Sequence, residues 1–244
     1  MKRFRMKLGI FGISFLIVAQ LVANTSGNFE AANESYNSGE YEKAAELYET
    51  LIPQKQSSAV FYNLGNTYYQ LQDYPKAILQ FEKALALAPT NPEIRANLKL
   101  TQEAAQLQPT EPSWTEVVAV KMNVNVWAWI AVVTFWGGAA LIILPPLWGW
   151  RGPIKSGLIV LCVLLFAVST IGLVGYHQLA KLGIAISDEA ALKISPTSTS
   201  PTKEYLKPGE SASIQRKHGN FFFVRTAEDK EGWVDSDFFK PVWD

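Results

Sequence analysis

Residues 61–89 have the sequence FYNLGNTYYQLQDYPKAILQFEKALALAP, and this stretch decides the fold of the N-terminal half of the chain. A copy lies 33 residues upstream, where Tyr41-Glu42-Lys43-Ala44 aligns with Tyr74-Pro75-Lys76-Ala77 and Tyr48-Glu49 aligns with Phe81-Glu82. Self-similarity at this period indicates stacked helical units, each burying its apolar face against its neighbour. We therefore expect an all-α domain built from repeats.

The second copy predicts how each unit packs. Small residues let its two helices approach closely, large ones fill the seam between them, and a proline ends the second helix. The residues expected in these roles are Leu64, Gly65, Tyr68, Ala77, Phe81, Ala84 and Pro89. This pattern is similar to the tetratricopeptide repeat, a helix–turn–helix unit of about 34 residues. The similarity is close in the second copy and weaker in the first, which is one residue shorter.

The domain boundaries follow from the same alignment. We expect a helical domain over residues 24–108, with repeats over about 25–57 and 58–91 and a capping helix over 92–107. Residues 109–123 are expected to be a linker. Two units and a cap bury little surface, so the domain should depend on the membrane hairpin or on a partner.

A second stripe on the first helix of each unit is a candidate binding surface. Residues at i, i+4 and i+7 share one helix face, and this stripe differs from the packing stripe. In tetratricopeptide domains the corresponding stripe lines a concave groove that holds peptides. The candidates for a groove that binds a peptide or protein partner are Phe29, Asn33, Tyr36, Tyr62, Asn66, Tyr69 and Gln70, with Asn37 as a weaker wall residue. The alternative is that the aromatic residues pack against the capping helix or lipid headgroups.

The charges divide the chain although their formal sum is zero, with 22 basic and 22 acidic residues. No Asp or Glu occurs between Val117 and Ser187, and two long uncharged stretches lie there. A span needs about 20 apolar residues, so we expect transmembrane helices over 124–147 and 156–179, joined by a turn over 148–155. A buried hairpin in a soluble protein is the alternative. The balanced charge also argues against a nucleic-acid binder.

The N-terminus and the turn predict the orientation. Residues 1–23 carry four basic side chains before an apolar run, which resembles a signal peptide cleaved after Ala23 or an uncleaved signal anchor. Positive loops stay in the cytoplasm, and the expected turn carries Arg151 and Lys155. Both soluble domains should then lie outside the cytoplasm, anchored in a bacterial cytoplasmic (inner) membrane and in contact with the lipid bilayer.

Residues 184–244 alternate short β-type runs with turn residues, which is typical of a small all-β barrel. The order of these runs, closing on Gly232-Trp233-Val234, is similar to the bacterial SH3-like domain. Related domains often bind cell-wall peptides or protein segments. The alternative is a packing module without a ligand of its own.

Catalytic and cofactor motifs are missing from the sequence. It has no glycine-rich phosphate loop and no zinc-protease or serine-hydrolase motif, and its one Cys and two His offer little for metal or acid–base chemistry. We expect no enzyme activity, no cofactor and no metal.

We therefore expect a multidomain membrane protein. The order of its parts (signal segment, helical repeats, membrane hairpin and SH3-like domain) resembles that of the BatE-type proteins of bacterial aerotolerance operons along the whole chain. That resemblance implies a non-enzymatic scaffold in stress tolerance, working with membrane-anchored von Willebrand factor A proteins and a MoxR-type ATPase. The rival interpretation is a cell-envelope sensor or peptidoglycan-binding protein that uses the SH3-like domain.

Overall fold

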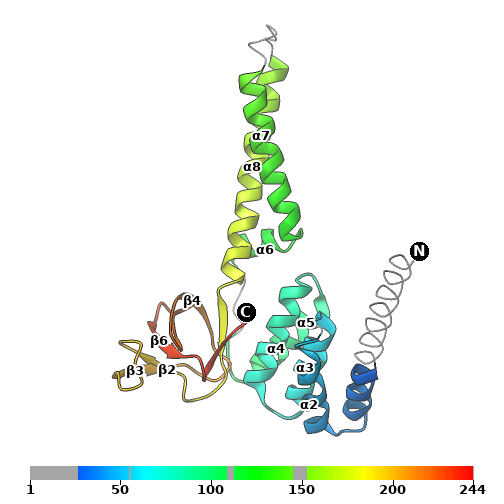
Figure 1. Cartoon of the computed structure of the whole chain (residues 1–244), viewed down its shortest axis with the longest axis vertical. Coiled ribbons are helices and arrows are strands. Elements are labelled where there is room, and N and C mark those ends of the chain that lie inside the picture. The colour runs from blue at the N-terminus through cyan, green and yellow to red at the C-terminus, as the bar shows by residue number, and fades with distance from the viewer. Residues whose placement is uncertain (1–26, 55, 109–112, 145–152, 244) are drawn as a thin grey trace, which may run out of the picture.

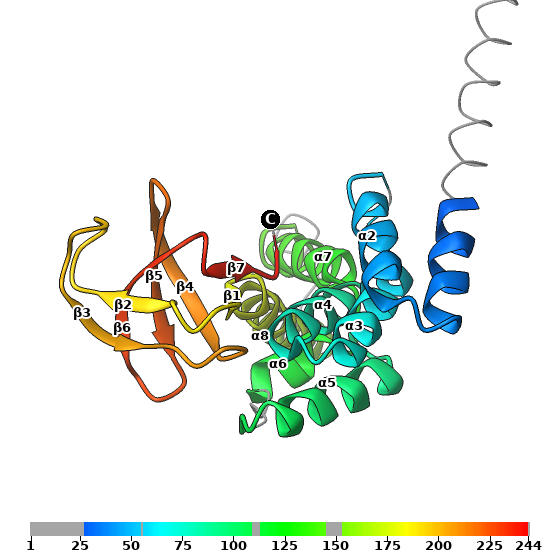
Figure 2. The same ribbon diagram turned by 90° about the horizontal axis from the view of Figure 1, so that it is seen from below.

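The computed structural model describes residues 27–54, 56–108, 113–144 and 153–243. A helical hairpin projects from a base in which helical repeats and a β-sheet lie side by side (Figures 1 and 2). The expected signal segment over 1–23 lies outside the described residues, as do positions 148–152 of the expected turn.

Five helices form the repeat part. A helix over residues 27–37 is followed by α2 (Tyr41–Leu51), α3 (Ser58–Gln70), α4 (Tyr74–Leu87) and α5 (Pro92–Ala104). Side-chain oxygens cap the N-termini of three of them, where they accept the orphan backbone N–H groups. The capping residues are Ser57 for α3, Asp73 for α4 and Asn91 for α5.

The same turn ends the first helix of each unit and occurs three times. Gly39, Gln72 and Gln106 all have a left-handed backbone, with φ of 79°, 61° and 57°. After each, the next backbone N–H bonds a carbonyl five residues back, at 2.9 Å in every case: Glu40 to Ser35, Asp73 to Tyr68 and Leu107 to Gln102. This is the helix-ending hydrogen bond of a Schellman motif. Because α5 ends as the two earlier first helices do, it corresponds to the first helix of a third unit.

The repeat core is built from the small and large residues that the second copy predicted. Leu64, Gly65, Ala77, Phe81 and Ala84 are buried, and a Cβ on Gly65 would lie 2.8 Å from the Phe81 ring. Glycine is therefore needed where this ring crosses α3.

Two long apolar helices form the hairpin. They are α7 (Val124–Ile143) and α8 (Pro153–Leu179), and both are long and apolar enough to cross a membrane. They pack against each other, and Gly172 lies so close to Trp127 that a Cβ would meet its indole at 2.6 Å. A short helix, α6 (Trp114–Ala119), lies at the base of the hairpin where the sequence predicted only a linker.

The C-terminal part is one antiparallel sheet. Its strands are β1 (Leu182–Ala185), β2 (Ala191–Lys193), β3 (Thr202–Tyr205), β4 (Ser211–His218), β5 (Phe221–Thr226), β6 (Glu231–Asp235) and β7 (Phe239–Pro241). Their order is β3-β2-β6-β5-β4-β1-β7. Within residues 182–243 the edge strands β3 and β7 do not pair, so the sheet is open and the predicted closed SH3-like barrel is not confirmed.

The end of the sheet that carries β1 and β7 packs against the repeats, whereas the sequence suggested the hairpin or a partner as their support. Ile184 of β1 and Val242 are buried in the same apolar cluster as Leu64 and Ile78. Gly209, with φ of 87°, approaches so closely that a Cβ would lie 2.8 Å from both Ile78 and Leu107. The sheet thus packs on α4 through β1, and the short helical domain gains the extra buried surface that two units and a half cannot supply alone.

Candidate functional site

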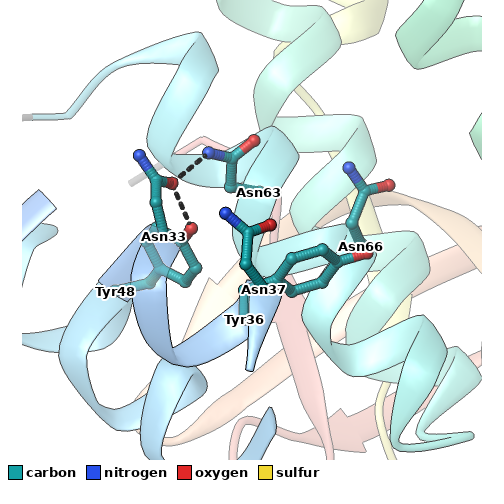
Figure 3. Close-up of a pocket in the computed structure, with 6 residues that line it drawn as sticks. All are labelled: Asn33, Tyr36, Asn37, Tyr48, Asn63 and Asn66. Atoms are coloured by element: carbon teal, nitrogen blue, oxygen red, sulfur yellow. Dashed lines mark hydrogen bonds between the residues drawn. The ribbon is translucent and has the colours of Figure 1, made fainter. Parts of the chain in front are cut away.

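A pocket of about 290 Å³ opens between the helix over 27–37 and α3. Four amides and two phenols line it: Asn33, Asn37, Asn63, Asn66, Tyr36 and Tyr48 (Figure 3). None of the six carries a charge at neutral pH. The pocket therefore offers only neutral hydrogen-bonding groups and aromatic surface.

Asn33 is held in place from both sides. Its Oδ1 accepts a hydrogen bond of 2.5 Å from the Tyr48 hydroxyl and one of 3.0 Å from Asn63 Nδ2. These bonds join three helices at the floor of the pocket and direct the Asn33 amide nitrogen away from them (Figure 3). Burial raises the pKa of Tyr48, so its hydroxyl stays a neutral donor.

The same asparagine contact recurs one unit further on. Asn97 of α5 donates to Asn66 Oδ1 at 2.9 Å and to the Tyr62 hydroxyl at 3.0 Å. Asn33 and Asn66 are equivalent by the repeat, and Asn63 and Asn97 are their respective donors. Consecutive first helices are therefore linked through paired amides, and α5 covers the second-unit half of the predicted groove.

The aromatic residues of the predicted stripe pack within their own units. Phe29 contacts Tyr48 and Tyr62 contacts Phe81, both with ring centroids 6.0 Å apart. Tyr36 contacts Tyr41 at 5.4 Å, and Tyr69 contacts the equivalent Tyr74 at 5.7 Å. Part of each ring is therefore used to join the two helices of a unit.

The predicted groove residues thus divide into two sets. Asn33, Tyr36, Asn37 and Asn66 line the pocket together. The others lie apart from its lining: Phe29, Tyr62 and Tyr69 in ring contacts, and Gln70, which is exposed at the end of α3.

Three polar residues at the groove were missed by the sequence analysis: Tyr48, Asn63 and Asn97. Tyr48 was aligned with Phe81, and its extra hydroxyl was the available signal. Asn63 precedes the buried Leu64 and resembled a helix surface residue. Asn97 lies 34 residues after Asn63, one residue more than the 33-residue period of the first two units.

Two equivalent glutamates, Glu49 of α2 and Glu82 of α4, have different surroundings. Glu49 accepts a hydrogen bond from the buried Tyr68 hydroxyl. Burial raises the pKa of the equivalent Glu82 to about 7, with Arg95 lowering it and Glu116 of α6 raising it further. Glu82 therefore carries a partial proton near neutral pH.

The pocket chemistry fits an extended polypeptide. Each amide offers donors and an acceptor, and among the described residues the amide nitrogens of Asn33 and Asn66 make no hydrogen bond to the protein. Backbone C=O and N–H groups of an extended segment match such neutral partners, whereas a charged group would be left without a counter-ion. No group of His, Cys, Asp and Glu in the described parts of the chain is placed to hold a metal ion.

A second pocket, of about 260 Å³, lies on the sheet. It is lined by Glu189, Ala191, Lys193, Thr202, Tyr205, Asp235 and Phe238. Tyr205 is 60% exposed on the edge strand β3. The Lys193 ammonium bonds the Ser198 carbonyl at 2.6 Å and so fixes the loop after β2.

Comparison with known proteins gives one family match. Residues 58–91, which comprise α3 and α4, match the model of the tetratricopeptide repeat. The chain matches no curated protein. The chain therefore contains a tetratricopeptide repeat, the kind of unit that serves as a scaffold for protein–protein interaction.

Proposed function

We propose that this chain is a non-enzymatic, membrane-anchored scaffold whose helical repeats bind an extended segment of a partner protein. The observation that supports this most is the uncharged pocket of four asparagine amides and two tyrosines beside a recognised tetratricopeptide repeat. α7 and α8 would hold this scaffold in the bacterial cytoplasmic membrane, with the repeats and the sheet outside the cytoplasm.

The resemblance to BatE-type proteins suggests which partners to look for. The partners in this proposal are von Willebrand factor A proteins in the same membrane, acting with a MoxR-type ATPase in aerotolerance. The order of repeats, apolar hairpin and C-terminal sheet supports this assignment.

The test uses two matched substitutions in the full-length chain purified in detergent. Asn37 lies at the pocket and is exposed, and Gln70 is the equivalent residue of the next unit, also exposed but outside the pocket lining. Asn37→Arg places a long side chain at the pocket, whereas Gln70→Arg makes the same chemical change away from it.

Partner proteins captured from membranes and identified by mass spectrometry should be lost with Asn37→Arg and retained with Gln70→Arg. If both variants capture the same proteins as the unmodified chain, the pocket is not the binding surface. Loss with both variants would indicate an effect of added positive charge and would also count against the pocket.

A second candidate function rests on the pocket of the sheet. Its exposed Tyr205 beside the carboxylates of Glu189 and Asp235 offers a ring and acceptors to a cell-wall peptide. Because β1 shares its core with the repeats, the test uses the whole chain. Sedimentation with purified cell wall that falls with Tyr205→Ala would support the peptidoglycan-binding role. A chain that stays in solution would exclude it.

A further inference from the structure

The short helix α6 has two faces with opposite properties. Its sequence is WTEVVA, and a capping box between Ser113 and Glu116 fixes its start. Thr115 and Ala119 are buried, whereas Trp114 is 66% exposed and Val117 is 42% exposed. Met122, three residues after the helix, is also exposed.

Hydrogen bonds join α6 and the turn after it to the two helices of the hairpin. Thr115 Oγ1 donates to Gln178 Oε1 at 2.6 Å, which joins α6 to the last turn of α8. Trp127 Nε1 donates to the Ala119 carbonyl at 2.9 Å, which joins the end of α6 to α7. The Tyr176 hydroxyl donates to the Met122 carbonyl at 2.9 Å.

Gly175 of α8 allows α6 and α8 to approach closely. A Cβ on Gly175 would lie 2.2 Å from the Thr115 carbonyl oxygen and 2.8 Å from Ala119 Cβ. The backbone of α6 therefore rests directly on the backbone of α8. Because the contact leaves no space for adjustment, the exposed side chains of α6 are held in a fixed direction relative to the hairpin.

The level of α6 along the hairpin is set by the same contacts. α7 begins at Val124, two residues after Met122, and α8 ends at Leu179, one residue after Gln178. α6 therefore lies where both apolar helices end. Exposed apolar side chains follow one another along the chain here, from Trp114 and Val117 of α6 to Met122 and then Val126 on the first turn of α7.

We propose that α6 and the turn after it lie at the membrane interface, with the exposed side chains of Trp114, Val117 and Met122 buried in the headgroup layer of the phospholipid bilayer. This inference rests on the proposed membrane anchoring of α7 and α8. Lipid is the favoured occupant because α6 is bonded to the hairpin at the level where α7 begins and α8 ends, and because tryptophan is enriched where an apolar ring meets a wet boundary. The exposed Lys121 nearby suits anionic headgroups.

The consequence concerns the repeats. α6 is the next described helix after α5 of the repeats, and Glu116 of α6 contributes to the raised pKa of Glu82 of α4. A helix fixed both to the hairpin and to the lipid surface would keep this end of the repeats close to the membrane.

Single-cysteine labelling of the full chain tests the proposal. In a Cys162→Ala background, which removes the only cysteine, an environment-sensitive fluorophore is attached at Trp114→Cys, Val117→Cys, Val133→Cys or Glu42→Cys. Val133 is an exposed residue within α7, and Glu42 is an exposed residue of α2. The protein is reconstituted alone into phosphatidylcholine–phosphatidylglycerol vesicles. Quenching is measured with headgroup-labelled lipid, acyl-chain-labelled lipid and aqueous iodide.

The expected result is graded. Labels at 114 and 117 should be quenched several-fold more by headgroup-labelled lipid than the label at 42, and should be shielded several-fold from iodide. The label at 133 should respond to acyl-chain-labelled lipid. The two α6 positions are exposed, so neither substitution should disturb folding, and each serves as a check on the other.

Two outcomes would overturn the inference, and they are distinguishable. If the labels at 114 and 117 are as open to iodide as the label at 42 while 133 is in lipid, the membrane anchoring stands and the exposed face belongs to a protein partner or to water. If the label at 133 is not quenched by acyl-chain-labelled lipid, the proposed membrane anchoring is wrong, and the proposed interfacial position of α6 is then wrong as well.

Discussion

The first and second helical units share a backbone path but use equivalent positions for different purposes. In the second unit the Phe81 ring lies against Gly65, and both are buried. In the first unit the equivalent residues are Tyr48 and Ala32. There the Tyr48 hydroxyl donates a hydrogen bond to Asn33 in the pocket, so the contact between the two helices is not wholly apolar.

This difference accompanies the match of the second unit to the repeat model, while the pocket between the two units takes its tyrosines from the first. The glycine and phenylalanine that make the second unit pack closely belong to the recognised repeat over residues 58–91. The first unit departs from that pattern at Tyr48, which supplies a hydroxyl to the floor of the pocket. Its weaker resemblance to the repeat thus accompanies a polar contact at the proposed binding pocket.

The largest effect should come from Gly65→Ala. The new Cβ would lie 2.8 Å from a Phe81 ring that is 1% exposed and has no space to move. Overpacking costs about 1–3 kcal/mol, and the gain of about 1 kcal/mol in helix propensity offsets only part of it. Thermal unfolding of the detergent-purified chain, followed by circular dichroism, should show a lower midpoint.

The control for Gly65→Ala is the reverse change at the equivalent position. Ala32→Gly should cost about 1 kcal/mol through helix propensity and lost burial. Gly65→Ala combined with Phe81→Leu should recover part of the stability. An unchanged or raised midpoint for Gly65→Ala alone would show that the ring contact does not require glycine.

The next effect depends on pH and compares Glu82 with Glu49. Burial raises the pKa of Glu82 to about 7, so the folded state binds this proton more tightly than the unfolded state does. The stability it contributes is present at low pH and is lost as the pH rises from about 4.5 to about 7. Glu82→Gln should therefore stabilise the protein by about 1–3 kcal/mol near pH 8 and by less than about 1 kcal/mol near pH 5.

Unfolding of both variants by denaturant at the two pH values measures this difference. Glu49→Gln serves as the matched control, since Glu49 accepts a hydrogen bond from Tyr68 and should not gain stability at either pH. Equal behaviour of the two variants would mean that burial does not distinguish the two carboxyl groups.

A smaller loss of stability is expected from Tyr48→Phe, which gives the first unit the residue type that the second unit has at the equivalent position, Phe81. The variant keeps the ring contact with Phe29 and removes the hydroxyl that donates to Asn33 at 2.5 Å. One lost hydrogen bond costs about 1 kcal/mol. Tyr69→Phe removes a hydroxyl outside the pocket and should leave the unfolding midpoint nearly unchanged. A Tyr48→Phe midpoint equal to that of the control would mean that the Asn33 contact adds no stability.

The sequence predicted the parts of this fold that depend on local patterns. The 33-residue offset located the units, and small residues facing large ones identified the contact of Gly65 with Phe81. The length of the uncharged stretches predicted the two apolar helices. In these cases the residues that decide the structure lie within one helix or within two consecutive helices, where periodicity is informative.

Contacts between distant segments could not be predicted in this way. β1 was expected in a closed barrel, but Ile184 is buried against the repeats, and no local pattern specifies that pairing. α6 has six residues, too few to show a period, and its position depends on Gly175 more than 50 residues later. Asn97 was missed because the third unit begins one residue later than a fixed offset allows.

The smallest expected effect is a gain in stability from a substitution at the N-cap of α2. Glu40 and Lys43 of the first unit form an ion pair at 2.7 Å, and the equivalent Asp73 and Lys76 form one at 2.9 Å. Asp73 also caps α4 by accepting the Lys76 backbone N–H, whereas the Glu40 side chain makes no capping bond to α2.

Aspartate is a preferred N-cap residue because its short side chain reaches the orphan N–H groups of the first turn, which the longer glutamate overshoots. Glu40→Asp keeps the charge and should therefore stabilise the chain by about 0.5 kcal/mol, measured as a small rise in the unfolding midpoint. Asp73→Glu, the reverse change in the second unit, should lower it by a similar amount. If both changes lower the midpoint, the first unit has adapted to glutamate and the two turns are not interchangeable. Opposite signs would show that the turns are equivalent in structure and differ only in the length of one side chain.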